Sequence, residues 1–229
     1  MSGGLPLIVT RPEPGNSATI ARATALGLDA YAVPLFAAQA IAWTAPPQAE
    51  FDALLLTSAQ AVRLAGPQLA RLAALPVYAV GTATAEAAQA AGLRVVKTGA
   101  ADAQSLVDAM TPEENARILW LCGRDRSELD PRGAALEPLA CYAVDALEPP
   151  RDWSKRIATP AVLLAHSARA AQRLAELVGS LRSHLALVAI SPAVAAAAGD
   201  GWAELATAAQ PSDASMLALA HALCHKGDK

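Results

Sequence analysis

The chain is poor in aromatic and charged residues, and this excludes several functions. Aromatic residues make up 4% of its 229 residues and charged residues 17%, with a net charge of −3. Nucleic-acid-binding surfaces are usually basic or rich in stacking aromatics, so we expect no nucleic-acid partner. Hydrophobic residues make up 54% of the chain, enough to build the core of one large domain or two small ones.

Metal-ligand and cofactor motifs are also missing from the sequence. The three cysteines, Cys122, Cys141 and Cys224, form no CxxC pair or Cys/His cluster, so we expect no metal site. No GxGxxG or GxxxxGK[ST] motif is present, which disfavours a nucleotide-binding enzyme and predicts that no cofactor is used. An odd cysteine count without a signal peptide favours the cytoplasm, and the absence of an 18-residue apolar run predicts no membrane span.

The most informative stretch is PVYAVGTATAEAAQAAGL, residues 76–93. It predicts a strand over Val77–Val80, a turn at Gly81, and an Ala-rich helix that is capped by Thr82 or Thr84. A turn of this kind directs free backbone N–H groups toward the end of a parallel sheet, where anions bind.

Strands alternate with helices along the whole chain, which predicts a parallel-sheet α/β protein. We expect Asn16 or Ser17 to cap a helix that runs through Leu26. We also expect a strand over Ala30–Pro34, which Phe36–Trp43 continues. A further short helix is predicted near Ser127–Leu136, followed by a strand over Leu139–Ala146. Each strand exit is a candidate ligand-binding position.

The two halves of the sequence resemble each other at an offset near 110 residues. The matching pairs are Leu55–Ala59 with Leu164–Ala168, Val80-Gly81 with Ile190-Ser191, Ser105-Leu106 with Ser215-Met216, and Tyr31–Val33 with Tyr142–Val144. Coincidence in an Ala/Leu-rich chain is the alternative explanation. The preserved order favours a duplication, and therefore two similar α/β domains facing a cleft. The repeat leaves open whether the first βαβ unit packs on its own half.

Several motifs together resemble one enzyme family. They are LIVTRP, LLLTSAQAVR, VYAVGTATAEAAQAAGL, LCGRDRSEL before LACYAV, LLAHSARAA, and LVAISPAVAAAAGDGW before SDASMLALAHAL. In this order, and over nearly the whole chain, they are similar to the uroporphyrinogen-III synthases. Two places depart from the family pattern: Ser127 stands where an Arg is common, and Ser191-Pro192 replaces a Gly and a hydroxyl-rich pair.

The resemblance implies a fold and an activity. It implies two doubly wound parallel-sheet α/β domains, one formed by residues 1–36 and 147–229 and the other by 42–140. They would be joined by a two-stranded β-ladder linker near 36–41 and 141–146. The enzyme would close linear hydroxymethylbilane to uroporphyrinogen III, inverting the last pyrrole ring, in an interdomain cleft and without a cofactor. Hydroxymethylbilane would be its small-molecule partner, and we expect a monomer.

The substrate carries eight carboxylates and a leaving hydroxymethyl group, which defines the side chains to look for. Tyr142 is the candidate acid at the leaving hydroxyl, by its match to a family tyrosine; the alternative is a half-buried strand tyrosine. The candidate carboxylate donors at strand exits are Arg11, Thr57, Ser58, Gly81, Thr82, Thr84, Gly123, Arg124, Arg126, Ser167 and Ser191. For the hydroxyls the alternative role is helix capping, and for the arginines it is a solvated surface.

A second class of function also fits two duplicated lobes. A non-catalytic anion-binding or sensor protein would have similar hydroxyl-lined strand exits. Incubation with hydroxymethylbilane, followed by measurement of isomer III against isomer I in the product, separates an enzyme from such a sensor.

Overall fold

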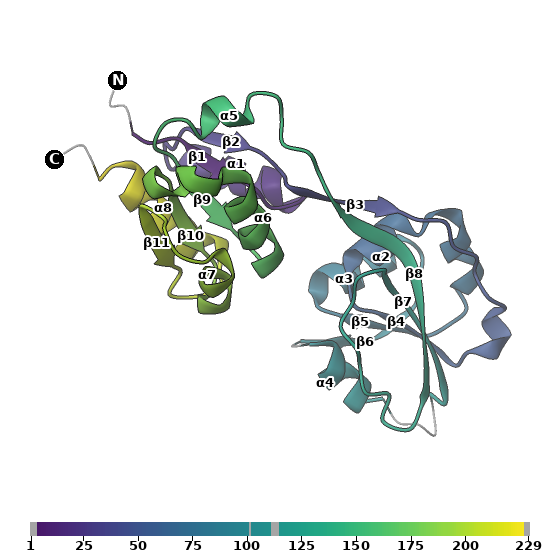
Figure 1. Ribbon diagram of the computed structural model, residues 1–229. Coiled ribbons are helices and arrows are strands. Elements are labelled where there is room, and N and C mark those ends of the chain that lie inside the picture. Colours follow the sequence, from purple (N-terminus) through teal and green to yellow (C-terminus); the bar gives the residue numbers. More distant parts are fainter. Residues whose placement is uncertain (1–3, 101, 111–114, 227–229) are drawn as a thin grey trace. The chain divides into compact units, whose positions relative to one another are not determined.

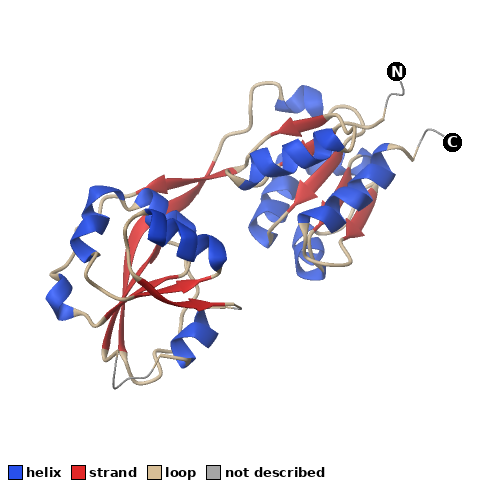
Figure 2. Cartoon of the chain, turned by 180° about the vertical axis from the view of Figure 1, so that it is seen from behind, coloured by secondary structure: helices blue, strands red, loops and turns tan. Residues whose placement is uncertain are grey.

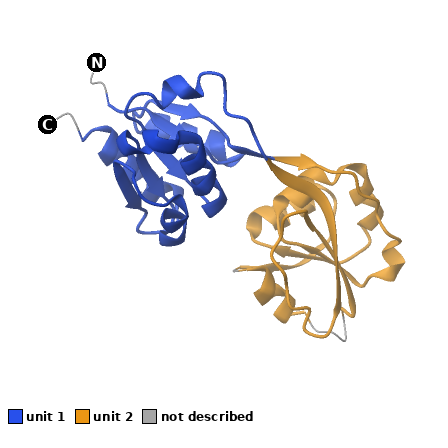
Figure 3. Ribbon diagram, viewed as in Figure 1, with its two compact units in different colours: residues 1–37, 146–229 blue, residues 38–145 orange. Residues whose placement is uncertain are grey.

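The computed structural model describes residues 4–100, 102–110 and 115–226, and it divides into two compact units (Figure 3). Unit 1 comprises Met1–Ala37 and Ala146–Lys229, and unit 2 comprises Ala38–Asp145. The chain therefore begins in unit 1, builds the whole of unit 2, and returns to complete unit 1.

Unit 1 is a parallel sheet covered by helices on both faces (Figures 1 and 2). Its strand order is β11-β10-β9-β1-β2, and neighbouring strands in this order pair in parallel. The strands are β1 (Leu7–Val9), β2 (Ala30–Ala32), β9 (Val162–Ala165), β10 (Ala186–Ala189) and β11 (Glu204–Thr207). The helices are α1 (Gly15–Ala25), α5 (Trp153–Arg156), α6 (Ala168–Val178), η3 (Gly179–His184), α7 (Pro192–Ala198) and α8 (Asp213–Cys224).

Unit 2 has the same kind of sheet with one strand added at its edge (Figure 1). The order is β3-β8-β7-β4-β5-β6, and β4 to β8 are parallel. The strands are β3 (Phe36–Ala40), β4 (Ala53–Leu56), β5 (Val77–Val80), β6 (Val95–Gly99), β7 (Arg117–Gly123) and β8 (Ala135–Ala146). The helices are η1 (Gln48–Glu50), α2 (Ala59–Leu64), η2 (Gly66–Leu72), α3 (Thr82–Ala90) and α4 (Ala103–Asp108).

The connection between the units is a two-stranded antiparallel pair. Ile41 N donates to the carbonyl of Cys141 at 3.1 Å, and Leu147 N donates to that of Leu35 at 2.8 Å. Residue numbers rise on one strand as they fall on the other, so β3 and the end of β8 run in opposite directions. Together with the two parallel sheets, this confirms the predicted fold class.

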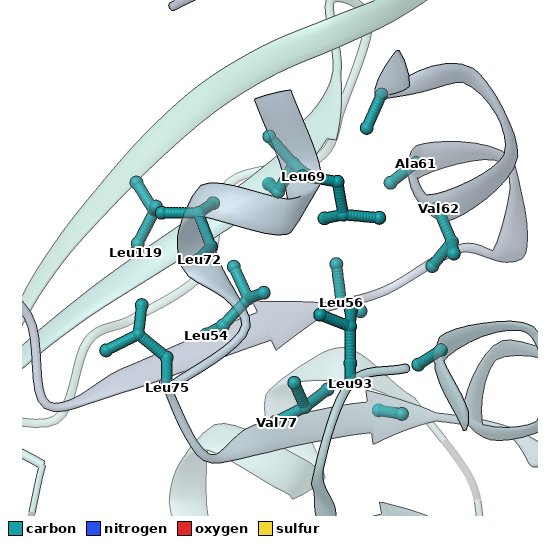
Figure 4. Close-up of a cluster of buried hydrophobic side chains, with 14 of the residues drawn as sticks. Leu54, Leu56, Ala61, Val62, Leu69, Leu72, Leu75, Val77, Leu93 and Leu119 are labelled. Carbon is teal, nitrogen blue, oxygen red and sulfur yellow. The ribbon is translucent and has the colours of Figure 1, made fainter. Parts of the chain in front are cut away.

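The strands are buried because they are short continuous apolar runs, as parallel strands between two helical layers must be. In β4, all four residues of ALLL are buried. Leu54 and Leu56 point to one face of the sheet, where they meet Leu69 and Leu72 of η2 (Figure 4). The alternate side chains of the strand face α4 on the other side. This rigid core fixes where each strand ends.

The two sheets are the same arrangement with the chain cut at different places. In unit 2 the order of β6, β5, β4, β7 and β8 matches β11, β10, β9, β1 and β2 in unit 1. This pairs β4 with β9, β5 with β10, and β8 with β2. These are the strand pairs that the 110-residue sequence repeat links. The first βαβ unit, formed by β1, α1 and β2, therefore belongs to the same compact unit as the second half of the chain. The sequence repeat alone left this open.

Several local predictions were wrong. The segment near Ser127–Leu136 is not a helix: residues 126–131 are irregular, and a turn at 132–133 leads into β8, which begins at Ala135. β3 does not continue β2, because β2 belongs to the sheet of unit 1 and β3 to that of unit 2. Helix α1 begins at Gly15 without a side-chain cap.

Two predicted caps also have different roles. Asn16 is fully buried and donates from Nδ2 to the carbonyls of Val9 and Arg11, both at 2.9 Å. It therefore ties the exit of β1 instead of capping α1. Helix α3 begins after Gly81, with no side-chain cap from Thr82 or Thr84.

Candidate functional site

The strand order defines one crevice in each unit. In doubly wound sheets, ligands bind beyond the carboxyl ends of the two strands where the winding direction reverses. In unit 2 these strands are β4 and β7, and in unit 1 they are β9 and β1. We call the strand exits at these positions the crest of each unit.

At the crest of unit 2, Thr57 follows β4 and is held by Trp120 of β7. The indole Nε1–H donates to Thr57 Oγ1 at 3.1 Å. A hydroxyl can accept and donate at once, so this contact orients the group while leaving its own proton to donate. Ser58 lies next to it and caps α2, accepting from Gln60 N at 3.2 Å.

Tyr142 lies at the same crest because β8 contains a β-bulge. The register with β7 shifts between Cys122 and Gly123, so that Tyr142 opposes Gly123 and Cys141 is the extra residue. As a result, both Cys141 and Tyr142 contact the core cluster that contains Leu54, which regular strand alternation would forbid.

The Tyr142 ring lies close against Gly123. A Cβ atom at position 123 would come within 2.9 Å of Cζ and 3.1 Å of the hydroxyl oxygen. The absence of a side chain at Gly123 therefore lets the phenol reach the end of β7. The backbone N–H of Arg124 donates to the Tyr142 carbonyl at 2.8 Å, which fixes this loop to β8.

The two arginines after β7 are in different environments. Arg124 is exposed and donates to the carboxylate of Asp145 at 2.7 Å, with Asp125 3.6 Å away. The guanidinium of Arg126 lies 5.8 Å above the centre of the Trp120 ring and donates to the Arg124 carbonyl at 3.3 Å. Neither contact of Arg126 neutralises its charge.

Gly81 forms the turn that the sequence predicts, but the hydroxyls of Thr82 and Thr84 do not cap the helix that follows. Gly81 has φ +77° and ψ 152°, a region open to glycine alone. Thr82 is exposed at the first position of α3, whereas Thr84 is buried, at 5% exposure. With so little exposure, Thr84 packs in the interior of unit 2.

Ser167 and Ser191 both cap helices in unit 1. Ser167 Oγ accepts from Ala170 N at 3.1 Å, and Ser191 Oγ accepts from Val194 N at 3.4 Å. Each hydroxyl retains a proton to donate, so capping and ligand binding are compatible at these positions.

The crest of unit 1 is built around a carboxylate that sequence reasoning missed. Asp213, at the start of α8, accepts from Thr19 Oγ1 at 2.8 Å and from Arg22 at 2.7 Å. His166 Nε2 lies 3.2 Å from it, and Arg11, which was expected to bind substrate, lies 3.5 Å away. The only sequence signals were positional. His166 directly follows the strand β9, and Asp213 directly follows Ser212, which caps α8.

Electrostatics hold this cluster in one protonation state. The His166 side chain is 8% exposed, and its burial lowers the pKa of the imidazole despite the opposing effect of Asp213. Burial would raise the pKa of Asp213, but hydrogen bonds from Thr19, Arg22 and His166 outweigh it and lower that pKa. With His166 neutral, two guanidinium charges and one carboxylate leave a net positive charge at this crest.

Within the described residues, no group of three or more His, Cys, Asp or Glu side chains could hold a metal ion. The helices of the described part of the chain include none that is long and apolar enough to cross a membrane. All three cysteines are free and buried.

Two parallel α/β units with polar strand exits at their winding reversals define a two-domain α/β protein with a small-molecule site. The sequence model of the family described as uroporphyrinogen-III synthase HemD matches residues 17–218, and the chain belongs to this family. It is a cyclising lyase of tetrapyrrole biosynthesis, as the family resemblance implied. Family membership disfavours the alternative of a non-catalytic sensor.

Solved structures show the same fold. Uroporphyrinogen-III synthetase from Helicobacter pylori 26695 is 17% identical, with a TM-score of 0.69 over 96% of this chain and 99% of that chain. A mutant uroporphyrinogen III synthase from the extremely thermophilic bacterium Thermus thermophilus is 18% identical, with a TM-score of 0.52 over 95% of this chain and 98% of that chain. No curated protein sequence matches the chain.

Proposed function

We propose that the crests of the two units bind the acetate and propionate carboxylates of hydroxymethylbilane and hold it in the shape that leads to uroporphyrinogen III. The observation that supports this most is the coincidence of polar side chains with the winding reversal in both sheets. Arg11 and Ser167 serve in unit 1, and Thr57, Arg126 and the N–H groups that open α3 serve in unit 2.

The chemistry asks little of the protein beyond positioning and one hydrogen bond. The departing hydroxyl leaves as water, with the proton balanced by the pyrrole N–H of the ring that becomes the azafulvene. The substituted carbon of the last ring then attacks the methylene carbon of this azafulvene and forms the spiro intermediate. The spiro intermediate then fragments and recloses with that ring inverted. We assign to Tyr142 the hydrogen bond to the departing oxygen. Effective molarity from a near-attack shape supplies most of the selectivity over the unrearranged closure.

We further propose that the enzyme acts as a cytoplasmic monomer and needs no metal or organic cofactor. Three free, buried thiols are consistent with a reducing compartment. The hydrogen-bond donor and the cations that the reaction needs are available from the phenol and guanidinium groups described above. Full turnover after exhaustive chelation and dialysis would support this proposal, and turnover restored only by an added metal or nucleotide would overturn it.

Thr57 offers a sharp test of carboxylate binding. Thr57→Val removes the donor, whereas Thr57→Ser keeps it. We expect KM for hydroxymethylbilane to rise about tenfold in Thr57→Val, since a hydrogen bond to a charged group is worth about 1.5 kcal/mol or more, and to stay near the wild-type value in Thr57→Ser. Equal KM values in the two variants would show that the hydroxyl does not contact the substrate.

A further inference from the structure

A pocket of about 480 Å³ lies inside unit 2, on the face of the sheet opposite η2. Its lining residues come from β7, from the loop after it, and from the start of β8. They include Trp120, Arg126, Ser127, Glu128, Leu129 and Leu136. Its volume is within the range of roughly 300–1,000 Å³ usual for small-molecule sites.

The lining combines an apolar wall with charged groups of both signs. Trp120, Leu129 and Leu136 supply apolar surface, and they belong to the same hydrophobic cluster. Arg126 lies over the Trp120 ring with its charge not neutralised by either of its contacts. Glu128 adds a carboxylate acceptor to the same lining.

This set of groups is complementary to one pyrrole ring that carries carboxylate side chains. The ring face needs apolar surface, each carboxylate needs a cation or hydroxyl, and the ring N–H needs an acceptor. The apolar wall would contact the ring face, and Arg126 and Ser127 would bind the carboxylates. Glu128 would accept the hydrogen bond from the ring N–H. A simple anion site would need no apolar wall, and a simple apolar pocket would not hold a guanidinium and a carboxylate.

The pocket is physically joined to the crest of unit 2. The ring of Trp120 forms part of its wall, while the indole N–H of the same residue donates to Thr57 at the end of β4. A ligand that contacts Trp120 therefore lies one side chain away from the hydroxyl to which we assign substrate binding. We propose that this pocket is the subsite for a single carboxylated pyrrole ring of the substrate, an inference that rests on the proposed function.

The test uses a monopyrrole with one acetate and one propionate, porphobilinogen, as the probe. The 229-residue chain has four tryptophans, so a ¹H–¹⁵N spectrum should resolve four indole N–H signals. Trp120→Phe identifies the Trp120 signal; if that variant does not fold, Trp43→Phe, Trp153→Phe and Trp202→Phe identify it by elimination. We expect titration with porphobilinogen to shift the Trp120 signal more than the other three.

Matched variants and a matched ligand sharpen the result. Arg126→Gln should weaken porphobilinogen binding about tenfold, and Arg126→Lys, which keeps the charge, should weaken it less. Arg71→Gln, an exposed arginine of η2 on the opposite face, should bind as the wild type does. Glutarate, which has two carboxylates and no ring, should bind more weakly than porphobilinogen.

The outcomes separate this inference from the proposed function. If the wild-type enzyme forms isomer III while porphobilinogen leaves the Trp120 signal unmoved, the subsite is wrong and the proposed function stands. Equal effects of Arg126→Gln and Arg71→Gln, or equal binding of glutarate, would also overturn it. A selective Trp120 shift with the predicted order of variants supports the subsite, whatever isomer the enzyme forms.

Discussion

At the scale of single residues, Tyr142 illustrates how a local irregularity positions a functional group. Its phenol reaches the end of β7 because a bulge adds Cys141 to β8 and because position 123 has no side chain. The sequence motif could suggest the tyrosine, but neither the bulge nor its contact with Gly123 could be read from the sequence. Both depend on pairing between strands.

Replacing Tyr142 with Phe tests its chemical role. Tyr142→Phe keeps the ring that packs on Gly123 and removes only the hydroxyl. We expect turnover to fall by at most about 10²–10⁴-fold, the usual range for a general acid, with thermal stability little changed and isomer III still the main product. Steady-state kinetics with product isomer analysis measure this. Undiminished turnover in a folded Tyr142→Phe enzyme would assign the tyrosine a structural role.

The backbone angles of Gly81 are ones that residues with a side chain rarely adopt. At φ +77° and ψ 152°, any side chain is strained although no atom lies within 4 Å of a Cβ built there. Gly81→Ala should therefore lower the free energy of unfolding by about 1–3 kcal/mol through backbone strain alone. Thr82→Ala, at the next and exposed position, is the control and should change it much less. Urea unfolding of both variants would show the contrast; equal stabilities would contradict it.

The three thiols should be unreactive while the protein is folded. Burial raises the pKa of Cys141 to about 12 and that of Cys224 to about 11, and it also raises the pKa of Cys122. Since the thiolate is the reactive form, an aromatic disulfide reagent should label none of them quickly in the native protein and all three in denaturant. Rapid labelling of even one native thiol would contradict this burial.

At the scale of elements, the sequence predicted the buried strands but not the start of α1. Buried parallel strands such as β4 appear as continuous apolar runs, so their positions follow from composition alone. The start of α1 does not, because Asn16 turns inward to tie the exit of β1. The segment near Ser127–Leu136 was predicted as a helix, but its apolar residues line the pocket wall instead, which only tertiary packing decides.

The burial of His166 at the end of β9 predicts how stability depends on pH. Because burial lowers the pKa of His166, the folded state holds its proton less tightly than the unfolded state, where the pKa is about 6.5. The contribution of the neutral, buried His166 to the free energy of unfolding is therefore present above about pH 6.5, and it is lost as the pH falls below that value. His166→Gln should flatten this part of the stability curve.

Asp213 contributes in a separate pH window. Its pKa is lowered in the folded state, so its contribution is present above about pH 3.9 and is lost as the pH falls further. Asp213→Asn should therefore alter the acid limb, while His166→Gln alters the slope near pH 6. Urea unfolding from pH 2 to 8 would separate the two effects. Identical curves for His166→Gln and the wild type would show that the imidazole does not titrate differently on folding.

At the scale of the whole molecule, the 110-residue repeat carried the most information. It linked β4 with β9 and β5 with β10, and the strand order bears out those pairs. What it could not give was the side-chain cluster at the crest of unit 1. Asp213 meets Thr19 and Arg22 across some 190 positions of sequence, and no local pattern records a contact of that kind.

The central claim is that this chain directs a linear tetrapyrrole to one of two ring closures. The most direct measurement is to incubate the purified enzyme with hydroxymethylbilane generated in the same reaction, and to separate the oxidised products by chromatography. We expect isomer III to dominate with the enzyme and isomer I to dominate without it. Isomer I in equal proportion with and without the enzyme would show that this chain does not direct the ring closure.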